Sequence, residues 1–362
     1  MHSTFDVRRS MFDIHLLFAL LSFCCLPATC FAVSETDLHS KLETDILPFF
    51  TSQLRFGAFH GQGDVPIHYA FFDTADEKGA LVITTGRQES IAKYAEVLFD
   101  LKDSGLDIYI MDHRGQGFSG RMLNDPRKGH VADFENYVAD LQTFVDSVVK
   151  KTPYAGTFYL SHSIGCTIGI LYAASFPDTF DGLILLSPFF EINTGLVPQW
   201  IVRGVVELFS MVGLDESFVP GGGSYTTDIP FADNIVTTSK KRYELTKKLV
   251  DLYPETALFG PTNRWVAEAS AAGGKALDAA SSLPRPILLL QAADDKVIRV
   301  SPQEEFCRKS EKCTLRKMPE AGHEILMERD SIRNQAFMHI RNFLQTRTGM
   351  KGVEAAGKRG KE

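Results

Sequence analysis

Short apolar runs alternate with longer stretches of helical period along most of this chain. The runs of strand length cover residues 54–59, 65–72, 81–84, 107–111, 157–160, 183–186, 286–290 and 315–318. The helical stretches cover residues 91–101, 134–149, 164–174, 302–307 and 332–343. Buried strands that alternate with helices are typical of a mostly parallel sheet covered on both faces. The pattern therefore predicts an α/β fold, and glycines between the first two runs indicate an antiparallel hairpin.

The interval between the runs at 183–186 and 286–290 is about 100 residues, far longer than an ordinary connection. Within it, an apolar stripe at 200–212 and a basic stretch at 240–252 both have helical period. We therefore predict a helical insertion over 188–284, which we interpret as a cap over the functional site. Because apolar stripes more often pack into a core, a purely structural insertion is the alternative.

The N-terminal segment has the organisation of a secretory signal. Two arginines precede the apolar run 16–23, and small residues follow shortly before Val33. The run is shorter than the roughly 20 apolar residues that a membrane span needs. We expect a signal peptide over 1–32, cleaved before Val33, and hence a periplasmic or secreted protein. An uncleaved anchor or a lipid-modified cysteine is the alternative.

Composition and charge narrow the classes of partner. The chain has 362 residues, of which 44% are hydrophobic and 23% charged, as in ordinary globular proteins. Its net charge of −7 and its lack of a basic, aromatic patch argue against nucleic acid as a partner. The tail 347–362 is basic and poor in apolar residues, so we expect it to be disordered and at most a weak contact for anionic lipid. No sequence feature specifies an oligomeric state.

The most informative motif lies where a predicted strand meets a predicted helix. Segment 161–165 reads S-H-S-I-G, directly after the run 157–160. A serine between small residues at such a sharp turn is typical of a nucleophile elbow, which lifts the hydroxyl above the sheet. Ser163 is therefore the candidate nucleophile for acyl transfer, although Ser161 stands where the motif usually has glycine.

An activated serine needs a base, and the base needs a carboxylate to orient it, in the chain order Ser, Asp or Glu, His. The run 286–290 is followed by Asp294 and Asp295, and spacing alone leaves both as candidates. His323 comes later, in a glycine-containing loop that can bring its imidazole over the sheet. We expect His323 to take the Ser163 proton and to return it to the leaving alcohol.

The tetrahedral intermediate of acyl transfer also needs hydrogen-bond donors for its oxyanion. These are usually the N–H group after the nucleophile and one from the loop after the third strand. The corresponding backbone donors here are those of Ile164 and Arg87. We interpret Gly86 as the residue that allows this loop to approach the substrate.

The motifs together resemble those of the α/β-hydrolases of the lysophospholipase L2 and monoacylglycerol lipase group, which are catalogued with serine aminopeptidase-like hydrolases. The matching strings are Gly86-Arg87-Gln88-Glu89-Ser90 with Lys93-Tyr94, Asp112-His113-Arg114-Gly115-Gln116-Gly117-Phe118-Ser119-Gly120-Arg121, Gly129-His130-Val131, Gly260-Pro261-Thr262 with Trp265, and His323-Glu324-Ile325-Leu326. The resemblance implies an eight-stranded hydrolase core over 45–187 and 285–346, with the insertion as a helical cap. Ser161 and Cys166 depart from it, since glycines are usual there.

By this resemblance, Ser163 is the nucleophile, Asp295 the orienting acid and His323 the base. Arg87 and Ile164 supply the oxyanion donors from their backbone. The implied activity is hydrolysis of the acyl ester of lysophospholipids or monoacylglycerols without a cofactor or a metal. In the resembling lipases the cap shapes an acyl-chain tunnel and can approach membranes.

Two other functions stay open: an aminopeptidase-like serine peptidase, and a non-catalytic lipid-binding protein that kept the fold. A dinucleotide-binding site is not predicted, although segment 115–120 fits G-x-G-x-x-G. No helical period follows that segment, whereas a dinucleotide site requires a helix there. The chain also lacks a phosphate loop and an H-E-x-x-H zinc motif.

The cysteines divide at the predicted cleavage point. Removal of the signal peptide leaves Cys166, Cys307 and Cys313. Because an exported protein can oxidise neighbouring thiols, Cys307 and Cys313 form a candidate disulfide beneath the catalytic carboxylate. Cys166 follows the elbow, and we expect it to pack in the core.

Overall fold

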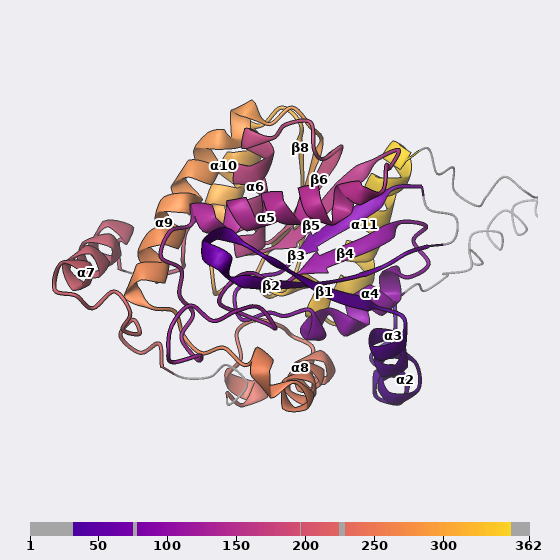
Figure 1. Ribbon diagram of the computed structural model, residues 1–362, viewed down its shortest axis with the longest axis horizontal. Helices are drawn as coiled ribbons and strands as arrows, with labels where there is room; N and C mark the ends of the chain where they lie inside the picture. The colour runs from indigo at the N-terminus through magenta and orange to yellow at the C-terminus, as the bar shows by residue number, and fades with distance from the viewer. Residues whose placement is uncertain (1–31, 75–77, 196, 224–228, 349–362) are drawn as a thin grey trace, which may run out of the picture. The chain divides into compact units, whose positions relative to one another are not determined.

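The computed structural model describes residues 32–74, 78–195, 197–223 and 229–348 and contains one eight-stranded sheet (Figure 1). The strands are β1 (Arg55–His60), β2 (Pro66–Phe72), β3 (Ala80–Thr84), β4 (Asp107–Met111), β5 (Thr157–His162), β6 (Gly182–Leu186), β7 (Ile287–Ala292) and β8 (Cys313–Met318). Their order is β1-β2-β4-β3-β5-β6-β7-β8. Strand β2 pairs antiparallel with β1 and β4, and all other pairs are parallel. The predicted α/β class, its strand number and the N-terminal hairpin are confirmed.

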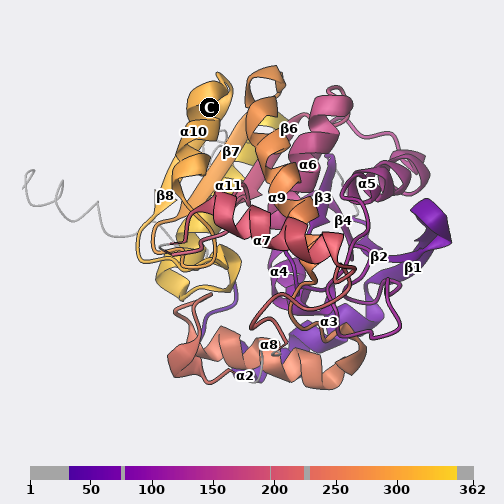
Figure 2. The same cartoon turned by 90° about the vertical axis from the view of Figure 1, so that its left-hand side faces the viewer.

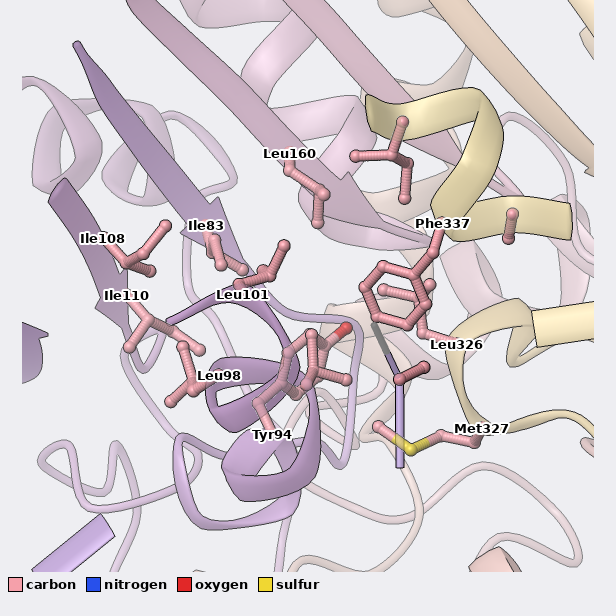
Figure 3. Packing of buried hydrophobic residues seen from close by; sticks show 14 of the residues in the cluster. Ile83, Tyr94, Leu98, Leu101, Ile108, Ile110, Leu160, Leu326, Met327 and Phe337 are labelled. Atoms are coloured by element: carbon pink, nitrogen blue, oxygen red, sulfur yellow. The ribbon is translucent and has the colours of Figure 1, made fainter. Parts of the chain in front are cut away.

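The central strands are buried from end to end because helices cover both faces of the sheet. Successive residues of a strand point to opposite faces and so join two separate apolar clusters. Ile83 of β3 and Leu160 of β5 lie in the first cluster, and their neighbours Val82 and Tyr159 lie in the second. In Figure 3 the first cluster brings Ile83 and Leu160 together with side chains from helices on that face, among them Phe337. Two-sided burial accounts for the continuous apolar runs in the sequence.

The helices divide between the two faces and the segment that joins β6 to β7. They are α2 (Leu38–Lys41), α3 (Leu47–Ser52), α4 (Ala95–Leu101), α5 (Glu135–Ser147), α6 (Ile164–Ser175), α7 (Gln199–Met211), α8 (Lys240–Leu252), α9 (Asn263–Asp278), α10 (Ser301–Lys309) and α11 (Asp330–Thr348). Helices α3, α4 and α11 pack into the first cluster, and α5, α6, α9 and α10 into the second. No helix within the described ranges has both the length and the apolar character needed to cross a membrane.

Two boundaries differ from the sequence-based expectation. Residues before 45, which the prediction leaves outside the core, form α2 and a π-helical turn (Leu42–Ile46), whose apolar side chains are buried against the first cluster. At the other end, α11 continues to Thr348, and Arg347 donates to the Phe343 carbonyl at 2.8 Å. The remainder of the expected tail, from 349, and residues 1–31 of the expected signal peptide lie outside the described residues.

The segment between β6 and β7 carries α7, α8 and α9. Helix α9 packs against α6 in the layer that covers the sheet. Helices α7 and α8 lie outside that layer, α8 below the sheet in both Figure 1 and Figure 2. The segment therefore contains one helix that covers the sheet and two that lie outside this layer but still place side chains in the core clusters: Leu245 and Leu249 of α8 in the first, and Val206 of α7 in the second.

A buried arginine attaches α8 to the core. Arg242 donates from Nε to both carboxylate oxygens of Glu96 on α4, at 3.0 and 3.2 Å. Its Nη1 donates to the Glu328 carbonyl at 2.7 Å, and its Nη2 lies 2.9 Å from Asp330 at the start of α11. All five donors of a guanidinium have a fixed geometry, so this residue orients α8 relative to two core helices.

We predict that Arg242→Met lowers the free energy of unfolding by about 3–5 kcal/mol, because it leaves the buried Glu96 carboxylate with one fewer cation. Chemical denaturation monitored by circular dichroism measures the change. Arg285→Met is the matched control, since its pair with Asp178 is exposed and worth at most about 1 kcal/mol. Equal effects of the two substitutions would contradict the anchoring role of Arg242.

Candidate active site

Ser163 occupies the turn between β5 and α6 with a backbone that serine rarely adopts. Its φ is 52° and its ψ is −118°, a conformation that the surrounding structure must hold in place. The Ser163 N–H donates to the Leu186 carbonyl at 3.0 Å, and the Ser163 carbonyl accepts from the Phe189 N–H at 3.1 Å. A Cβ atom at Gly165 would lie 2.7 Å from the Thr85 carbonyl oxygen. The local sequence thus makes the sharp turn that the motif predicts.

The two residues that depart from the usual motif are both buried. Ser161 is the fifth residue of β5 and is fully buried. The Cys166 thiol donates to the Ser161 carbonyl at 3.2 Å. Burial raises the pKa of Cys166 to about 12, so the side chain stays a neutral thiol that packs behind the turn.

The structure brings Ser163, His323 and Asp295 into one hydrogen-bonded chain. His323 Nε2 lies 2.9 Å from Ser163 Oγ, and its Nδ1 lies 2.7 Å from Asp295 Oδ2. Asp295 Oδ1 also accepts from the backbone N–H groups of Val297 and Ile298, at 2.8 and 3.0 Å. With Nδ1–H donating to Asp295, Nε2 has its lone pair directed at the serine hydroxyl. The arrangement has the geometry of a nucleophile, a base and an orienting carboxylate.

Burial and hydrogen bonding shift the pKa of Asp295 in opposite directions. Burial by itself raises its pKa, but the hydrogen bond and charge of His323, together with the two backbone N–H groups, outweigh it and lower the pKa below its usual value. Asp295 is therefore ionised at neutral pH. Its rival Asp294 is exposed, with its own N–H bonded to the Ala321 carbonyl at 3.0 Å. Only Asp295 faces the histidine.

The two expected oxyanion donors line one cavity with Ser163. Within the described ranges, neither the Arg87 nor the Ile164 backbone N–H donates a hydrogen bond to another protein group. Both remain available for a substrate oxygen. The Arg87 side chain is no surface charge: Nη1 donates to the Phe259 carbonyl at 2.9 Å, and burial lowers its pKa to about 10. This bond ties the loop after β3 to the chain that precedes α9.

A buried ionic network that the sequence reasoning did not assign lies behind the triad. His162 Nδ1 lies 2.9 Å from Glu89 Oε2, and His162 Nε2 lies 3.1 Å from the His323 carbonyl oxygen. Both neighbours only accept hydrogen bonds, so both ring nitrogens carry protons and His162 is an imidazolium. Burial lowers the pKa of His162, but the charge of Glu89 and its hydrogen bond outweigh burial and raise it above the ordinary value.

Glu89 connects this imidazolium to the loop after β3. Its carboxylate accepts from the Gly86 N–H and from the Tyr94 hydroxyl, and it lies 3.1 Å from Lys93 Nζ. Burial raises the pKa of Glu89, but the charges of His162 and Lys93 outweigh it and hold the pKa well below its usual range. Lys93 also pairs with Glu324 at 2.6 Å. The network therefore holds both the oxyanion loop and the His323 loop.

Gly86 makes room for two buried side chains. A Cβ atom there would lie 2.8 Å from His162 Nδ1 and 2.9 Å from Glu89 Oε2. Glycine thus admits the Glu89–His162 pair beneath the loop. The sequence signals only that His162, inside a buried strand, needs a polar partner, and not which residue that partner is.

Two other motif segments are structural. Asp112 accepts from the Ile91 and Phe118 N–H groups, both at 2.8 Å, and so shapes the loop that contains 115–120. His130 Nδ1 lies 2.9 Å from the Thr262 hydroxyl, which joins the string 129–131 to the string 260–262 within the segment between β6 and β7. No group of His, Cys, Asp or Glu in the described part of the chain is arranged to hold a metal ion.

The Ser163–His323–Asp295 hydrogen-bond chain opens into a cavity of about 390 Å³. Ser163, His323 and both oxyanion residues line it. Apolar walls come from the loops after β6 and β7 and from α9, with Phe189, Ile192, Val219, Trp265, Val297 and Ile298. Cys307 on α10 and Cys313 at the start of β8 are joined in a disulfide, as the sequence suggests.

Comparison with known proteins places these features in a family. Residues 75–330 match the family model described as serine aminopeptidase, S33. Lysophospholipase L2 of Escherichia coli K12 is 33% identical over 305 residues, which cover 81% of this chain and 88% of that protein. A probable lysophospholipase L2 of Haemophilus influenzae is 27% identical, covering 87% of this chain and 100% of its own. Among solved structures, a soluble monoglyceride lipase variant of Saccharomyces cerevisiae, in complex with a substrate analog, shares the fold. Its TM-score is 0.63 at 19% identity, over 82% of this chain and 96% of that one.

We predict that Glu89→Gln lowers the free energy of unfolding by about 3–5 kcal/mol, because two buried cations lose their shared anion. Since the folded pKa of His162 is raised, its stabilising contribution is complete at low pH and is lost as pH rises through that folded pKa. The variant should lack this loss. Unfolding free energies measured across pH, with the His162 ring followed by NMR, test both statements.

Asp64→Asn is the matched control for that prediction, because it removes the carboxylate from the exposed pair with His60. We expect it to change stability by less than about 1 kcal/mol. A His162 ring that titrates at or below pH 6.5 in the unsubstituted protein would contradict the imidazolium assignment.

Proposed function

The chain belongs to the serine aminopeptidase S33 family of α/β-hydrolases, and on that premise we propose that it cleaves the acyl ester of lysophospholipids or monoacylglycerols through Ser163, Asp295 and His323. It is a carboxylic ester hydrolase of the lysophospholipase and monoacylglycerol lipase type. The observation that carries the mechanism is the Ser163–His323–Asp295 hydrogen-bond chain at a cavity with apolar walls.

The first half-reaction acylates Ser163. The serine oxygen attacks the ester carbonyl carbon while His323 Nε2 accepts the hydroxyl proton. The carbonyl electron pair moves to oxygen, where the N–H groups of Arg87 and Ile164 stabilise the oxyanion. Asp295 holds the ring in the required tautomer and stabilises the imidazolium. The carbon–oxygen bond to the alcohol then breaks, and His323 returns the proton to that alcohol.

The second half-reaction releases the fatty acid. Water enters, loses a proton to His323 and attacks the acyl-enzyme carbonyl carbon. A second oxyanion forms at the same two donors and collapses, and His323 returns the proton to Ser163. One water is consumed, and one ester becomes one carboxylic acid and one alcohol. The balance requires only the groups of the chain, the ester and this water.

We propose that the segment 188–284 acts as a cap that receives the acyl chain. It contributes Val219, Trp265 and the α8 residue Tyr243 to the cavity that contains Ser163. Hydrogen bonds from Arg87 and Gln88 to the backbone of 258–259 support a fixed distance between this wall and the oxyanion loop. An apolar wall favours a hydrocarbon chain over a peptide amino terminus, which needs anionic or polar partners.

We further propose export, with residues 1–32 removed as a signal peptide. The buried Val33 N–H donates to the Asp100 carboxylate at 2.8 Å. Cleavage before Val33 would create an ammonium group at this position, directly facing that carboxylate. The contact supports the cleavage point that the sequence predicts.

Peripheral contact with a membrane completes the proposal. Helix α7 exposes large apolar side chains, with Trp200 74%, Leu208 56% and Met211 78% exposed. Such a face is typical of a helix that lies in a membrane interface. A lipid hydrolase gains from this contact because its substrates reside in the membrane.

We predict that the purified protein releases fatty acid from lysophospholipid and monoacylglycerol, and that Ser163→Ala lowers kcat by up to about 10⁶-fold. Chromatographic fatty-acid assays with both lipids, a short-chain ester and an aminoacyl amide provide the measurement. Thr167→Ala, behind the elbow and away from the reacting atoms, is the control for folding. Turnover of the amide alone would support the peptidase instead, and turnover of nothing would support the binding protein.

We predict that Trp200→Ser combined with Met211→Ser weakens binding to phospholipid vesicles at least 10-fold, because burial of one large apolar side chain is worth about 1.5–3 kcal/mol. Vesicle co-sedimentation measures the change. Hydrolysis of a soluble short-chain ester should be unaffected, since α7 supplies no group to the reaction. Undiminished vesicle binding would reject α7 as the contact.

A further inference from the structure

The cavity at Ser163 is basic although the chain as a whole is acidic. Four cationic side chains, Arg87, Lys93, His162 and Lys247, line it, against a single carboxylate, that of Glu324. The net charge of the chain is −7. An excess of positive charge in the cavity therefore runs against the overall composition and calls for a local explanation.

The cations near the triad are already satisfied. Lys93 pairs with Glu324 at 2.6 Å and with Glu89 at 3.1 Å. Arg87 donates to the Phe259 carbonyl and to the Gln88 side-chain oxygen, at 2.9 and 2.8 Å. Lys247 is different: it has no ion pair and no side-chain hydrogen bond with any residue that the structure describes.

The other lysines of α8 show that pairing is available on this helix. Lys240 lies 3.7 Å from Glu244, Lys241 donates to the Glu35 carbonyl at 2.8 Å, and Lys248 pairs with Glu43. These three groups have partners away from the cavity. Lys247 instead shares the cavity-lining face of α8 with Tyr243, Thr246 and Val250, which follow helical spacing.

The Lys247 residue is half-buried beside apolar walls and has no protein anion as a partner among the described residues. The arrangement is favourable when a ligand supplies the anion. The acyl chain of an ester at Ser163 cannot do so, but the phosphate of a lysophospholipid head group can, and lysine is a common point-charge ligand for phosphate. A monoacylglycerol carries no charge at all.

We propose that Lys247 binds the phosphodiester group of a lysophospholipid whose ester carbonyl lies at Ser163, and thereby selects phosphate-bearing lysolipids over neutral monoacylglycerols. This inference rests on the proposed function, because it requires that the ester be cleaved at Ser163. The acyl chain then follows the walls at Ile192, Trp265 and Ile298, and the head group turns toward α8. Helices α8 and α9, which supply Lys247 and Trp265, lie apart in both views (Figures 1 and 2).

The test compares kcat/KM for lysophosphatidylglycerol and for a monoacylglycerol of the same acyl chain, in the same detergent micelles. We expect the unsubstituted protein to prefer the phospholipid. Lys247→Met should lower the ratio of the two kcat/KM values about 10- to 100-fold, the size expected for a lost charge-assisted hydrogen bond. Lys247→Arg should retain most of the preference, because it keeps the charge. Lys240→Met, on the outer face of the same helix, is the matched control and should leave the ratio unchanged.

The outcomes separate this inference from the function on which it rests. If the unsubstituted protein cleaves neither lipid, the proposed function fails. If it cleaves both, and Lys247→Met leaves their ratio unchanged, the phosphate site is overturned while the ester hydrolase stands. If Lys247→Met only relieves inhibition by added fatty acid, the group binds the product carboxylate, and the assignment to phosphate is again overturned.

Discussion

The Glu89 carboxylate lies where three separate segments of the candidate active site meet. It accepts from Gly86 on the oxyanion loop, pairs with His162 on the nucleophile strand, and through Lys93 reaches Glu324 beside the catalytic histidine. Buried charges are tolerated only when each has its partners. The three segments must therefore assemble together, and the proposed oxyanion donors, nucleophile and base are positioned before a substrate arrives, as electrostatic stabilisation of a transition state requires.

Contacts between distant segments also fix the site at two further points. The φ of 52° at Ser163 is held by backbone bonds to Leu186 and Phe189, which belong to the next strand and the loop after it. On the other side of the cavity, Arg242 fixes α8 to α4 and α11. The sheet thus determines where the hydroxyl lies, and buried ion pairs determine where the cavity walls lie.

The charged groups around Ser163 and those on α8 differ in whether a cation remains unpaired for a ligand. Around Ser163 the opposite charges are matched, so in the proposed mechanism backbone N–H groups, rather than a free cation, stabilise the developing oxyanion. On α8, Lys247 lines the cavity without a protein anion as a partner among the described residues. We infer that reaction and recognition are separated: the neutralised end of the cavity serves the ester, and the cationic end serves the head group.

The sequence by itself determined the α/β class, the hairpin and the candidates Ser163 and His323, because strand and helix periods, chain order and the small residues of an elbow are local properties. It could not choose between Asp294 and Asp295, since neighbouring residues differ only in the direction that the folded loop gives them. It also left the helices between 38 and 52 unassigned, because their stability comes from the core on which they pack. The pairing of Glu89 with His162 and the isolation of Lys247 were decided by the tertiary structure alone. A charge is matched or unmatched only by groups that folding brings from distant parts of the chain, and no local pattern records which groups those are.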